Sequence, residues 1–213
     1  MALAFSAVAG RVVVQNLIDV ITENRQSLSD IDGAIGDGDH GVNMAKGFSM
    51  AGERLDESMG LTEALKTLGS VLMMEIGGSM GPLYGKFFRS MANECKDLSE
   101  IDSNVLSKML HAGYDAITEI GGAKPGDKTL VDALDPAITA FDDAIATDSS
   151  FADALEVMRN AAEAGKESTR DMIAKLGRAA RLGERSKGAL DAGATSCWLI
   201  LDSMSRTMVE LLG

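Results

Sequence analysis

The sequence predicts an all-α fold in which about eight amphipathic helices surround a shared interior. Apolar residues recur three and four positions apart along most of the 213 residues, and segments that alternate apolar with polar residues are absent. Alanine and methionine supply much of the apolar content, whereas aromatic residues make up only 4% of the chain. Because alanine and methionine favour helices and aromatic residues favour strands, composition and periodicity point to the same class.

The helices are expected at residues 4–28, 40–56, 61–76, 81–95, 103–119, 129–146, 150–176 and 193–212. In chain order, the clearest apolar stripes are Val14/Leu17/Ile18/Ile21, Leu61/Leu65/Leu68/Leu72, Leu106/Met109/Leu110/Ile117, Leu130/Leu134/Ile138/Phe141 and Leu201/Met204/Met208/Leu211. Each segment is amphipathic rather than apolar all round, so the helices should pack side by side. No linker or low-complexity stretch interrupts them, and we expect a single domain over residues 1–213.

The overall charge excludes several classes of function. A formal net charge of −12 and an isoelectric point near 4.6 disfavour binding to nucleic acids and to anionic membranes. Eighteen apolar residues never run together, and the N-terminal residues lack the pattern of a signal peptide. Cys95 and Cys197 lie far apart in the sequence and form no CxxC motif, so we expect them to be reduced thiols in the core. We therefore expect a soluble cytoplasmic protein.

The connections between the helices are of two kinds. Residues 56–60 and 146–150 form plain turns. Four other connections are rich in glycine and carry polar residues that a turn does not need, namely residues 32–41, 77–85, 121–129 and 177–193. We expect these four loops to gather at one end of the helical bundle and to carry the function.

The first of these loops is acidic. Asp32, Asp37 and Asp39 lie within eight residues, and His40 and Asn43 follow at once. Carboxylates this close repel one another unless a cation joins them, and hard oxygen ligands on a glycine-rich turn suit Mg²⁺. A helix that begins near His40 would add free backbone N–H groups for an anion. The loop therefore predicts magnesium with a phosphate group beside it.

Other interpretations of these segments fit less well. An EF-hand loop that begins at Asp30 lacks the terminal glutamate, and the glycine pattern of residues 36–41 follows a helix rather than a strand. In residues 126–129, Asp127 separates the glycine from the lysine of a Walker loop. A turn in which Asp39 caps a helix remains the structural alternative, and it leaves the clustering of three carboxylates unexplained.

The remaining loops allow two interpretations each. Gly78 suits the end of a helix and Pro82 the start of the next, while Ser79 and free N–H groups could also hold a phosphate. In the third loop, Asp127 is expected to cap the following helix. The fourth loop is basic, which usually marks a solvated surface, although Arg178 could offset phosphate charge at the metal site. Asp191 should cap the last helix and could also accept a hydrogen bond from a ribose or base.

Five stretches together resemble the nucleotide-binding L subunit of bacterial dihydroxyacetone kinases, a unit that also forms the C-terminal domain of single-chain members. Their order and approximate spacing agree with the family over nearly the whole chain. The stretches are Ile35-Gly-Asp-Gly-Asp-His-Gly41, Gly77-Gly-x-x-Gly-Pro-Leu-Tyr-Gly85, Pro125-Gly-Asp-Lys-Thr129, Gly177-Arg-Ala-x-x-Leu-Gly-Glu-Arg-Ser186 and Asp191-x-Gly-Ala-Thr-Ser196.

The resemblance implies a closed barrel of eight antiparallel amphipathic helices with ADP or ATP bound in the loops at one end. It implies that Asp32, Asp37 and Asp39 hold two Mg²⁺ ions and that Arg178 assists catalysis. The residues implied to contact the nucleotide are His40, Gly41, Asn43, Gly78, Ser79, Met80, Gly121, Leu130, Arg178, Asp191, Ala192 and Gly193. Two positions depart from the family pattern, since Met80 replaces a small hydroxyl residue and Ala192 replaces a proline.

The resemblance also implies a missing half of the enzyme. In this family a separate K subunit holds the ketone through a covalent bond to a histidine, and the two histidines here, His40 and His111, do not provide that site. The chain is expected to dock on a K subunit. Either ADP stays bound and is recharged by a phosphocarrier protein of the phosphoenolpyruvate system, or ATP exchanges as a substrate. Another ketose as acceptor, a nucleotide-sensing partner of a transcription regulator and a fatty-acid kinase domain are the alternatives.

Overall fold

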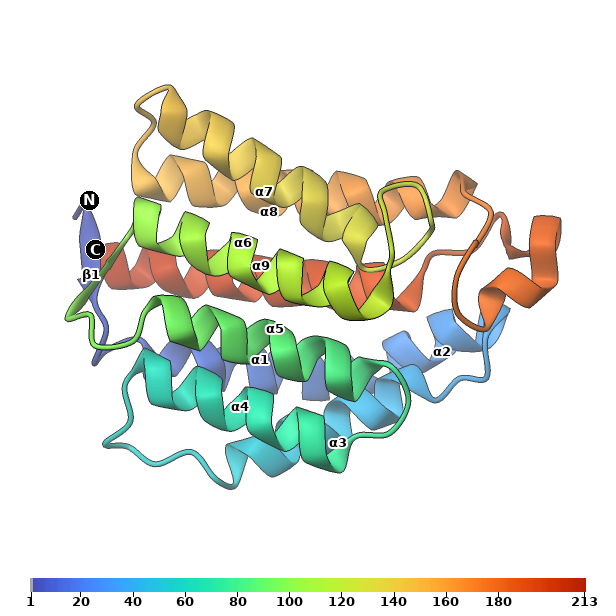
Figure 1. Cartoon of the computed structure of the whole chain (residues 1–213), viewed down its shortest axis with the longest axis horizontal. Coiled ribbons are helices and arrows are strands. Elements are labelled where there is room, and N and C mark those ends of the chain that lie inside the picture. Colours follow the sequence, from blue (N-terminus) through green and yellow to red (C-terminus); the bar gives the residue numbers. More distant parts are fainter. Residues whose placement is uncertain (1) are drawn as a thin grey trace.

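A computed structural model describes residues 2–213 and confirms the helical class (Figure 1). Nine α-helices occur in these residues: α1 (Arg11–Glu23), α2 (Arg25–Ile35), α3 (His40–Gly52), α4 (Leu61–Glu75), α5 (Met80–Glu94), α6 (Ser103–Gly121), α7 (Val131–Ala146), α8 (Phe151–Ser168) and α9 (Ala192–Leu212). Two 3₁₀ helices, η1 (Thr169–Asp171) and η2 (Ala179–Ser186), lie between α8 and α9.

The expected first helix at residues 4–28 is wrong, because the chain there forms a strand and two helices. Strand β1 (Ala4–Ser6) pairs antiparallel with β2 (Glu100–Asp102), and three residues are too few to display an alternating pattern. Helix α1 ends where the side chain of Asn24 donates a hydrogen bond of 2.8 Å to the carbonyl oxygen of Val20. Asparagine competes in this way with the helical hydrogen bonds, so α2 starts as a separate element.

The expected helix at residues 150–176 is also too long. Helix α8 ends at Ser168, and η1 follows it before the chain enters an irregular connection. The other expected helices agree with the structure to within a few residues, as is usual for helix ends.

Helices α1 and α2 lead toward the same end of the molecule, and from α2 onward successive helices run in alternating directions (Figure 1). From α3 onward each helix contacts the next, and α9 returns to pack against α1, which itself contacts α3 and α4. Apolar side chains fill the interior, with Phe48, Tyr84, Phe87 and Phe88 among the largest that are fully buried. The return of α9 to α1 favours the closed barrel, which stays a prediction.

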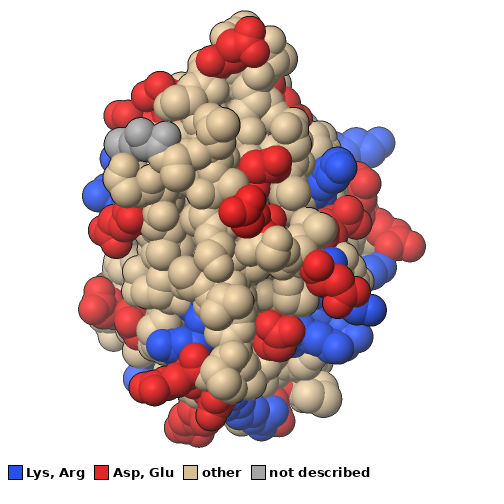
Figure 2. Space-filling model, turned by 90° about the vertical axis from the view of Figure 1, so that its left-hand side faces the viewer, with Lys and Arg blue, Asp and Glu red and all other residues tan. Residues whose placement is uncertain are grey.

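The alternating directions divide the connections between two ends of the molecule. The four glycine-rich connections join α2 to α3, α4 to α5, α6 to α7, and α8 to α9 at the right-hand end of Figure 1. Both chain termini and strand β1 lie at the opposite end. Figure 2 shows that opposite face, where acidic and basic side chains are interspersed with uncharged ones. No helix within residues 2–213 combines the length and hydropathy that a transmembrane segment requires.

The contact between α4 and α5 depends on a pair of glycines. A Cβ atom at Gly69 would lie 2.7 Å from the carbonyl oxygen of Gly85, and one at Gly85 would lie 2.9 Å from the carbonyl oxygen of Gly69. Both obstacles are backbone atoms, which cannot move aside as a flexible side chain does. The two helices therefore approach closely enough to exclude any side chain at these positions.

We expect Gly69→Ala and Gly85→Ala each to lower the free energy of unfolding by about 1–3 kcal/mol, because the added methyl group separates packed helices. Urea unfolding followed by circular dichroism measures the change. Gly77→Ala is the matched control, since a Cβ atom there meets no other atom within 4 Å. Equal losses for all three variants would contradict the proposed close contact.

Candidate functional site

A pocket of about 300 Å³ opens at the end of the molecule where the glycine-rich loops meet. All the residues that the sequence suggested for the site line this pocket, with the exception of Gly41. They are Asp32, Asp37, Asp39, His40, Asn43, Gly78, Ser79, Met80, Gly121, Leu130, Arg178, Asp191, Ala192 and Gly193. The structure thus brings together residues that lie as much as 161 positions apart in the chain, between Asp32 and Gly193. Their roles in binding stay predictions.

Gly41 has a structural reason to be glycine. It is buried in the first turn of α3, and a Cβ atom there would collide with the carbonyl oxygen of Arg25 and the backbone nitrogen of Ser29 in α2. The close approach of α2 to α3 therefore requires glycine and sets the direction of the acidic turn between the two helices.

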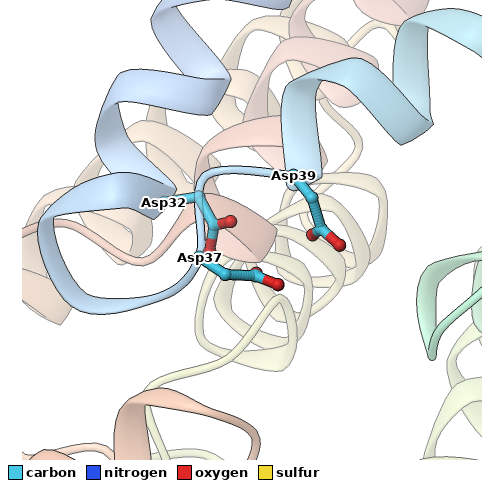
Figure 3. Close-up of side chains that lie close together, drawn as sticks. All are labelled: Asp32, Asp37 and Asp39. Atoms are coloured by element: carbon cyan, nitrogen blue, oxygen red, sulfur yellow. The ribbon is translucent and has the colours of Figure 1, made fainter.

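Three carboxylates lie close together around the turn between α2 and α3, as Figure 3 shows, and all three residues line the pocket. Asp32 lies in the last turns of α2 rather than in the loop, Asp37 lies in the turn, and Asp39 immediately precedes α3. One oxygen from each of the three lies within 4.8 Å of the others. Asp39 occupies the N-cap position but its side chain makes no capping bond. Its carboxylate is therefore available to a cation.

The basic fourth loop supplies a cationic partner for this cluster. The guanidinium group of Arg178 pairs with Asp37, and a second nitrogen lies 3.8 Å from Asp39. Arg178 precedes η2 and is largely exposed, so its long side chain reaches the cluster from outside. Three clustered carboxylates, two of which already contact a positive group, fit a hard divalent cation such as Mg²⁺. The residues present are therefore suited to hold magnesium.

Helix N-termini provide the anion-binding side of the pocket. Helices α3, α5, α7 and α9 all begin at this end, and their first-turn N–H groups carry a partial positive charge. Ser79 precedes α5, lines the pocket and makes no capping bond. Its side chain therefore leaves the first N–H groups of α5 without a capping partner. The predicted cap at Asp191 is confirmed, because its side chain accepts a hydrogen bond of 2.7 Å from the backbone nitrogen of Ala194.

The expected cap at Asp127 is wrong. Helix α7 begins at Val131, and Asp132 accepts hydrogen bonds from the backbone nitrogens of Gly126 and Thr129 at 2.5 and 2.7 Å. Asp127 instead accepts a hydrogen bond from the backbone nitrogen of Lys124 within the loop. Local sequence favours an aspartate just before a helix, but here one inside the first turn reaches back to order the loop.

A buried hydrogen-bond chain supports His40. Its Nε2 atom lies 3.0 Å from the hydroxyl oxygen of Ser196 in α9, which lies 3.0 Å from the hydroxyl oxygen of Tyr84 in α5. Burial lowers the pKa of His40 to about 4, although the nearby charge of Asp32 opposes the shift. The imidazole is therefore neutral near pH 7 and its ring is held in place by the hydroxyl of Ser196. Sequence analysis missed Ser196 and Tyr84, although both lie inside stretches that carried the resemblance.

An apolar wall completes the pocket. Apart from Leu130, its residues were not predicted as site residues. Ile117 belongs to an apolar stripe, and such a stripe does not reveal which of its members border a cavity. The wall consists of Leu83, Ile117, Ala123, Leu130 and Leu176. The pocket thus combines an apolar wall with a region that carries both carboxylates and an arginine. This combination suits a ligand with a flat apolar part and an anionic part.

Asp191 is half-buried in the lining of this pocket. Burial raises the pKa of its carboxyl group to about 7, with the capping bond from Ala194 and the charge of Lys128 acting in the opposite direction. The unfolded chain releases this proton near pH 4, whereas the folded protein retains it up to about pH 7. Stability associated with this group is therefore lost as the pH rises between those values.

We expect Asp191→Asn, which keeps a capping oxygen but does not ionise, to gain stability relative to the natural chain as the pH rises. The difference in unfolding free energy should grow by roughly 2 kcal/mol or more between pH 5 and pH 8. Urea unfolding of the chain without nucleotide or metal at both pH values measures it. Asp153→Asn, at an exposed position in α8, is the control. A difference that does not change with pH contradicts the raised pKa.

Comparisons with known proteins agree with this geometry. Residues 34–206 match the DAK2 domain family. The chain is 39% identical over 192 residues to the ADP-binding subunit DhaL of a PEP-dependent dihydroxyacetone kinase from Listeria innocua, an alignment that covers 89% of this chain and 91% of that relative. It is 36% identical over 196 residues to the corresponding subunit from Escherichia coli, with 90% and 92% covered.

Among solved structures, the chain resembles the dihydroxyacetone kinase of C. freundii in its complex with AMP-PNP and Mg²⁺. The TM-score is 0.71 at 22% identity, with 97% of this chain and 35% of that chain covered, so this likeness concerns the fold. The native form of the same kinase gives a TM-score of 0.69 at 24% identity, with 92% and 34% covered. From the family match over most of the chain, and from relatives that align over nearly their full length, the chain belongs to the DAK2 domain family.

Proposed function

We propose that this chain is the nucleotide-binding, phosphoryl-transferring subunit of a dihydroxyacetone kinase and that it carries ADP as a bound coenzyme. The observation on which this rests is the combined pocket, in which an apolar wall and four helix N-termini adjoin a cluster of three carboxylates and an arginine. Relatives named ADP-binding subunits of PEP-dependent dihydroxyacetone kinases support the choice of reaction.

The pocket suggests how a nucleotide would lie in it. The base would pack against the apolar wall, while the phosphates would reach the N-terminal turns of α3 and α5, near Asn43 and Ser79. Two Mg²⁺ ions between Asp32, Asp37, Asp39 and the phosphates would balance charges that otherwise repel. Bound magnesium would neutralise phosphate charge and stabilise the charge that develops during transfer.

Arg178 is the residue of this chain that we assign to catalysis. Its side chain already reaches the carboxylate cluster, so a small change of rotamer would bring it to a phosphate held at the same place. A guanidinium group there stabilises the transferring phosphoryl group, and neutral His40 would donate or accept a hydrogen bond without adding charge. None of the side chains needs to act as a nucleophile in this scheme.

The ketone is assigned to a partner K subunit. His40 is buried and bonded to Ser196, and His111 lies on α6, where it pairs with Asp142 at 2.7 Å. Five large apolar side chains are exposed in the segments that border the pocket and would suit a partner that closes over it. They are Val42, Met73, Met74, Ile120 and Leu176. Cys95 and Cys197 are buried free thiols, which is consistent with a protein that functions in the reducing cytoplasm.

The phosphoryl acceptor and the phosphoryl donor of the proposed reaction are assigned on separate grounds. A D-erythrulose kinase of Mycolicibacterium smegmatis is 35% identical to this chain over 84% of it, and the chain spans 32% of that relative. Another ketose is therefore the second candidate for acceptor, and the K subunit would select it. For the donor, we favour a phosphocarrier protein of the phosphoenolpyruvate system over exchangeable ATP, because the aligned stand-alone relatives bear names of the PEP-dependent kind.

The decisive experiment combines purified chain with a K subunit, dihydroxyacetone, Mg²⁺ and either ATP or a phosphoenolpyruvate-driven carrier system. We expect ketone phosphorylation with the carrier system when both subunits are present, and ADP that remains bound through purification. Phosphorylation without the K subunit contradicts the division of labour. A dependence on added ATP with no retained ADP favours the exchangeable mode, and retained ADP without transfer favours a sensory role.

We expect Arg178→Met to lower the rate of phosphoryl transfer about 10³-fold while ADP affinity changes much less, because this charge acts mainly on the transferring group. Asp37→Asn should instead weaken Mg²⁺-dependent ADP binding about tenfold or more. Steady-state kinetics and titration calorimetry with and without Mg²⁺ separate the two. Arg181→Met, three residues further along in η2, is the control for loss of positive charge. Equal effects of both arginine variants would contradict the role of Arg178.

A further inference from the structure

The segment that carries Arg178 has little apolar packing of its own. Among residues 172–190, only Ala174 and Ser186 are buried, and most of the others are exposed. A connection of this length with a single buried apolar side chain is expected to be mobile unless polar contacts hold it. The position of the Arg178 side chain therefore depends on what fixes this segment, which we call the arginine segment (residues 172–190).

Lys128, which lines the pocket, provides three such contacts. This residue of the α6–α7 loop is only 1% exposed. Its Nζ atom donates hydrogen bonds to the carbonyl oxygens of Met172, Ser186 and Ala189 at 3.3, 2.5 and 2.7 Å. One buried ammonium group thus contacts the first residue of the arginine segment and two residues near its end.

The backbone at Lys128 supports a specific role for the side chain. Lys128 has a φ of 60°, a left-handed conformation that residues other than glycine, asparagine and aspartate seldom adopt. A glycine would fit this backbone with less strain. The lysine is therefore best explained by what its side chain does.

The three contacts use all the donors that an ammonium group has. Lys128 lines the pocket but has no N–H left for a phosphate, so it differs from a lysine that binds the phosphate directly. A second tie from the same loop joins Asp127 to Lys175 at 3.2 Å, but Lys175 is mostly exposed and such pairs contribute little. Backbone hydrogen bonds also hold the segment, from the nitrogen of Lys175 to the oxygen of Asp127 at 3.1 Å and from the nitrogen of Gly188 to the oxygen of Arg170 at 2.7 Å. Lys128 adds side-chain contacts that reach both the start of the segment and its last residues.

We propose that Lys128 is a positioning residue that holds the arginine segment so that Arg178 reaches the carboxylate cluster and, on the function proposed above, the transferring phosphoryl group. Its three hydrogen bonds cross from the α6–α7 loop to the α8–α9 connection, and its buried charge lies beneath the pocket. Removing the side chain frees the segment and withdraws Arg178 without removing any group that contacts the metal or the phosphates.

The first test measures the segment itself. Limited trypsin digestion, read by mass spectrometry, reports cleavage after Arg178, Arg181, Arg185 and Lys187. We expect cleavage to be roughly tenfold faster or more in Lys128→Met than in the natural chain, because local opening becomes easier. The matched control is Lys175→Met, which breaks only the exposed tie and should change the rate less than about threefold. Unchanged cleavage in Lys128→Met overturns the proposal.

A second variant separates local release from general unfolding. Lys128→Gly removes the same contacts but accepts the left-handed backbone, so it should cleave as fast as Lys128→Met while circular dichroism shows the helices intact. If both variants lose their helical signal, Lys128 supports the whole fold rather than the arginine segment, and the proposal is overturned.

The third test asks whether Lys128 acts through Arg178. Transfer with the K subunit present should fall at least tenfold in Lys128→Met, and the double variant with Arg178→Met should be no slower than Arg178→Met alone, within about threefold. ADP affinity in the Arg178→Met background should not change when Lys128 is replaced. Additive losses, or a further loss of ADP affinity, would mean that Lys128 contacts the ligand and would overturn the proposal.

These measurements also separate this inference from the proposed function. If the natural chain transfers no phosphoryl group with any K subunit, the proposed function fails, while the digestion results still decide whether Lys128 holds the arginine segment. If transfer proceeds and digestion is unaffected by the replacement of Lys128, the proposed function stands and the inference fails.

Discussion

Mutual repulsion among Asp32, Asp37 and Asp39 is the constraint on which the rest of the site depends. Carboxylates whose oxygens lie within 4.8 Å of one another repel by roughly 1 kcal/mol per pair in water and by about 3 kcal/mol at an effective dielectric constant of 20. The fold maintains this arrangement because the close contact at Gly41 fixes the turn between α2 and α3. Positive charge nearby relieves this repulsion; Arg178 provides it in this structure, and on the proposed function magnesium would provide it as well.

The alternation of helix directions explains why an acidic protein can bind an anion beside that cluster. Each reversal of the chain places the N-terminus of α3, α5, α7 or α9 at the same end, where free N–H groups carry partial positive charge. Carboxylates for the cation and helix N-termini for the anion therefore meet within a single pocket. The net charge of −12 is a property of the whole surface and does not describe this local field.

Sequence patterns predicted the parts of this site whose chemistry is local. Asp32, Asp37 and Asp39 are close in the chain, and the cap at Asp191 follows from its place before a helix, so both were recognisable. Contacts between distant segments could not be recognised in this way. The hydrogen-bond partners of the His40 and Lys128 side chains were therefore missed. That Asp132 rather than Asp127 orders the start of α7 depends on how the loop folds back. The break at Asn24 depends on one side-chain hydrogen bond. Periodicity is insensitive to both.

Two residues of opposite charge type in the lining of the pocket, Asp191 and Lys128, determine the charge of its inner part. Burial raises the pKa of Asp191 and lowers the pKa of Lys128, and the charge of each partly opposes the shift of the other. With the Lys128 ammonium held by three carbonyl oxygens and the Asp191 carboxyl able to keep its proton near pH 7, the floor of the pocket is less negative than its residue types suggest. Negative charge is thereby concentrated at the mouth, where Arg178 and magnesium can meet it. On the proposed function, the phosphates of a nucleotide would lie beside carboxylates that would hold the metal and above a floor that does not repel them.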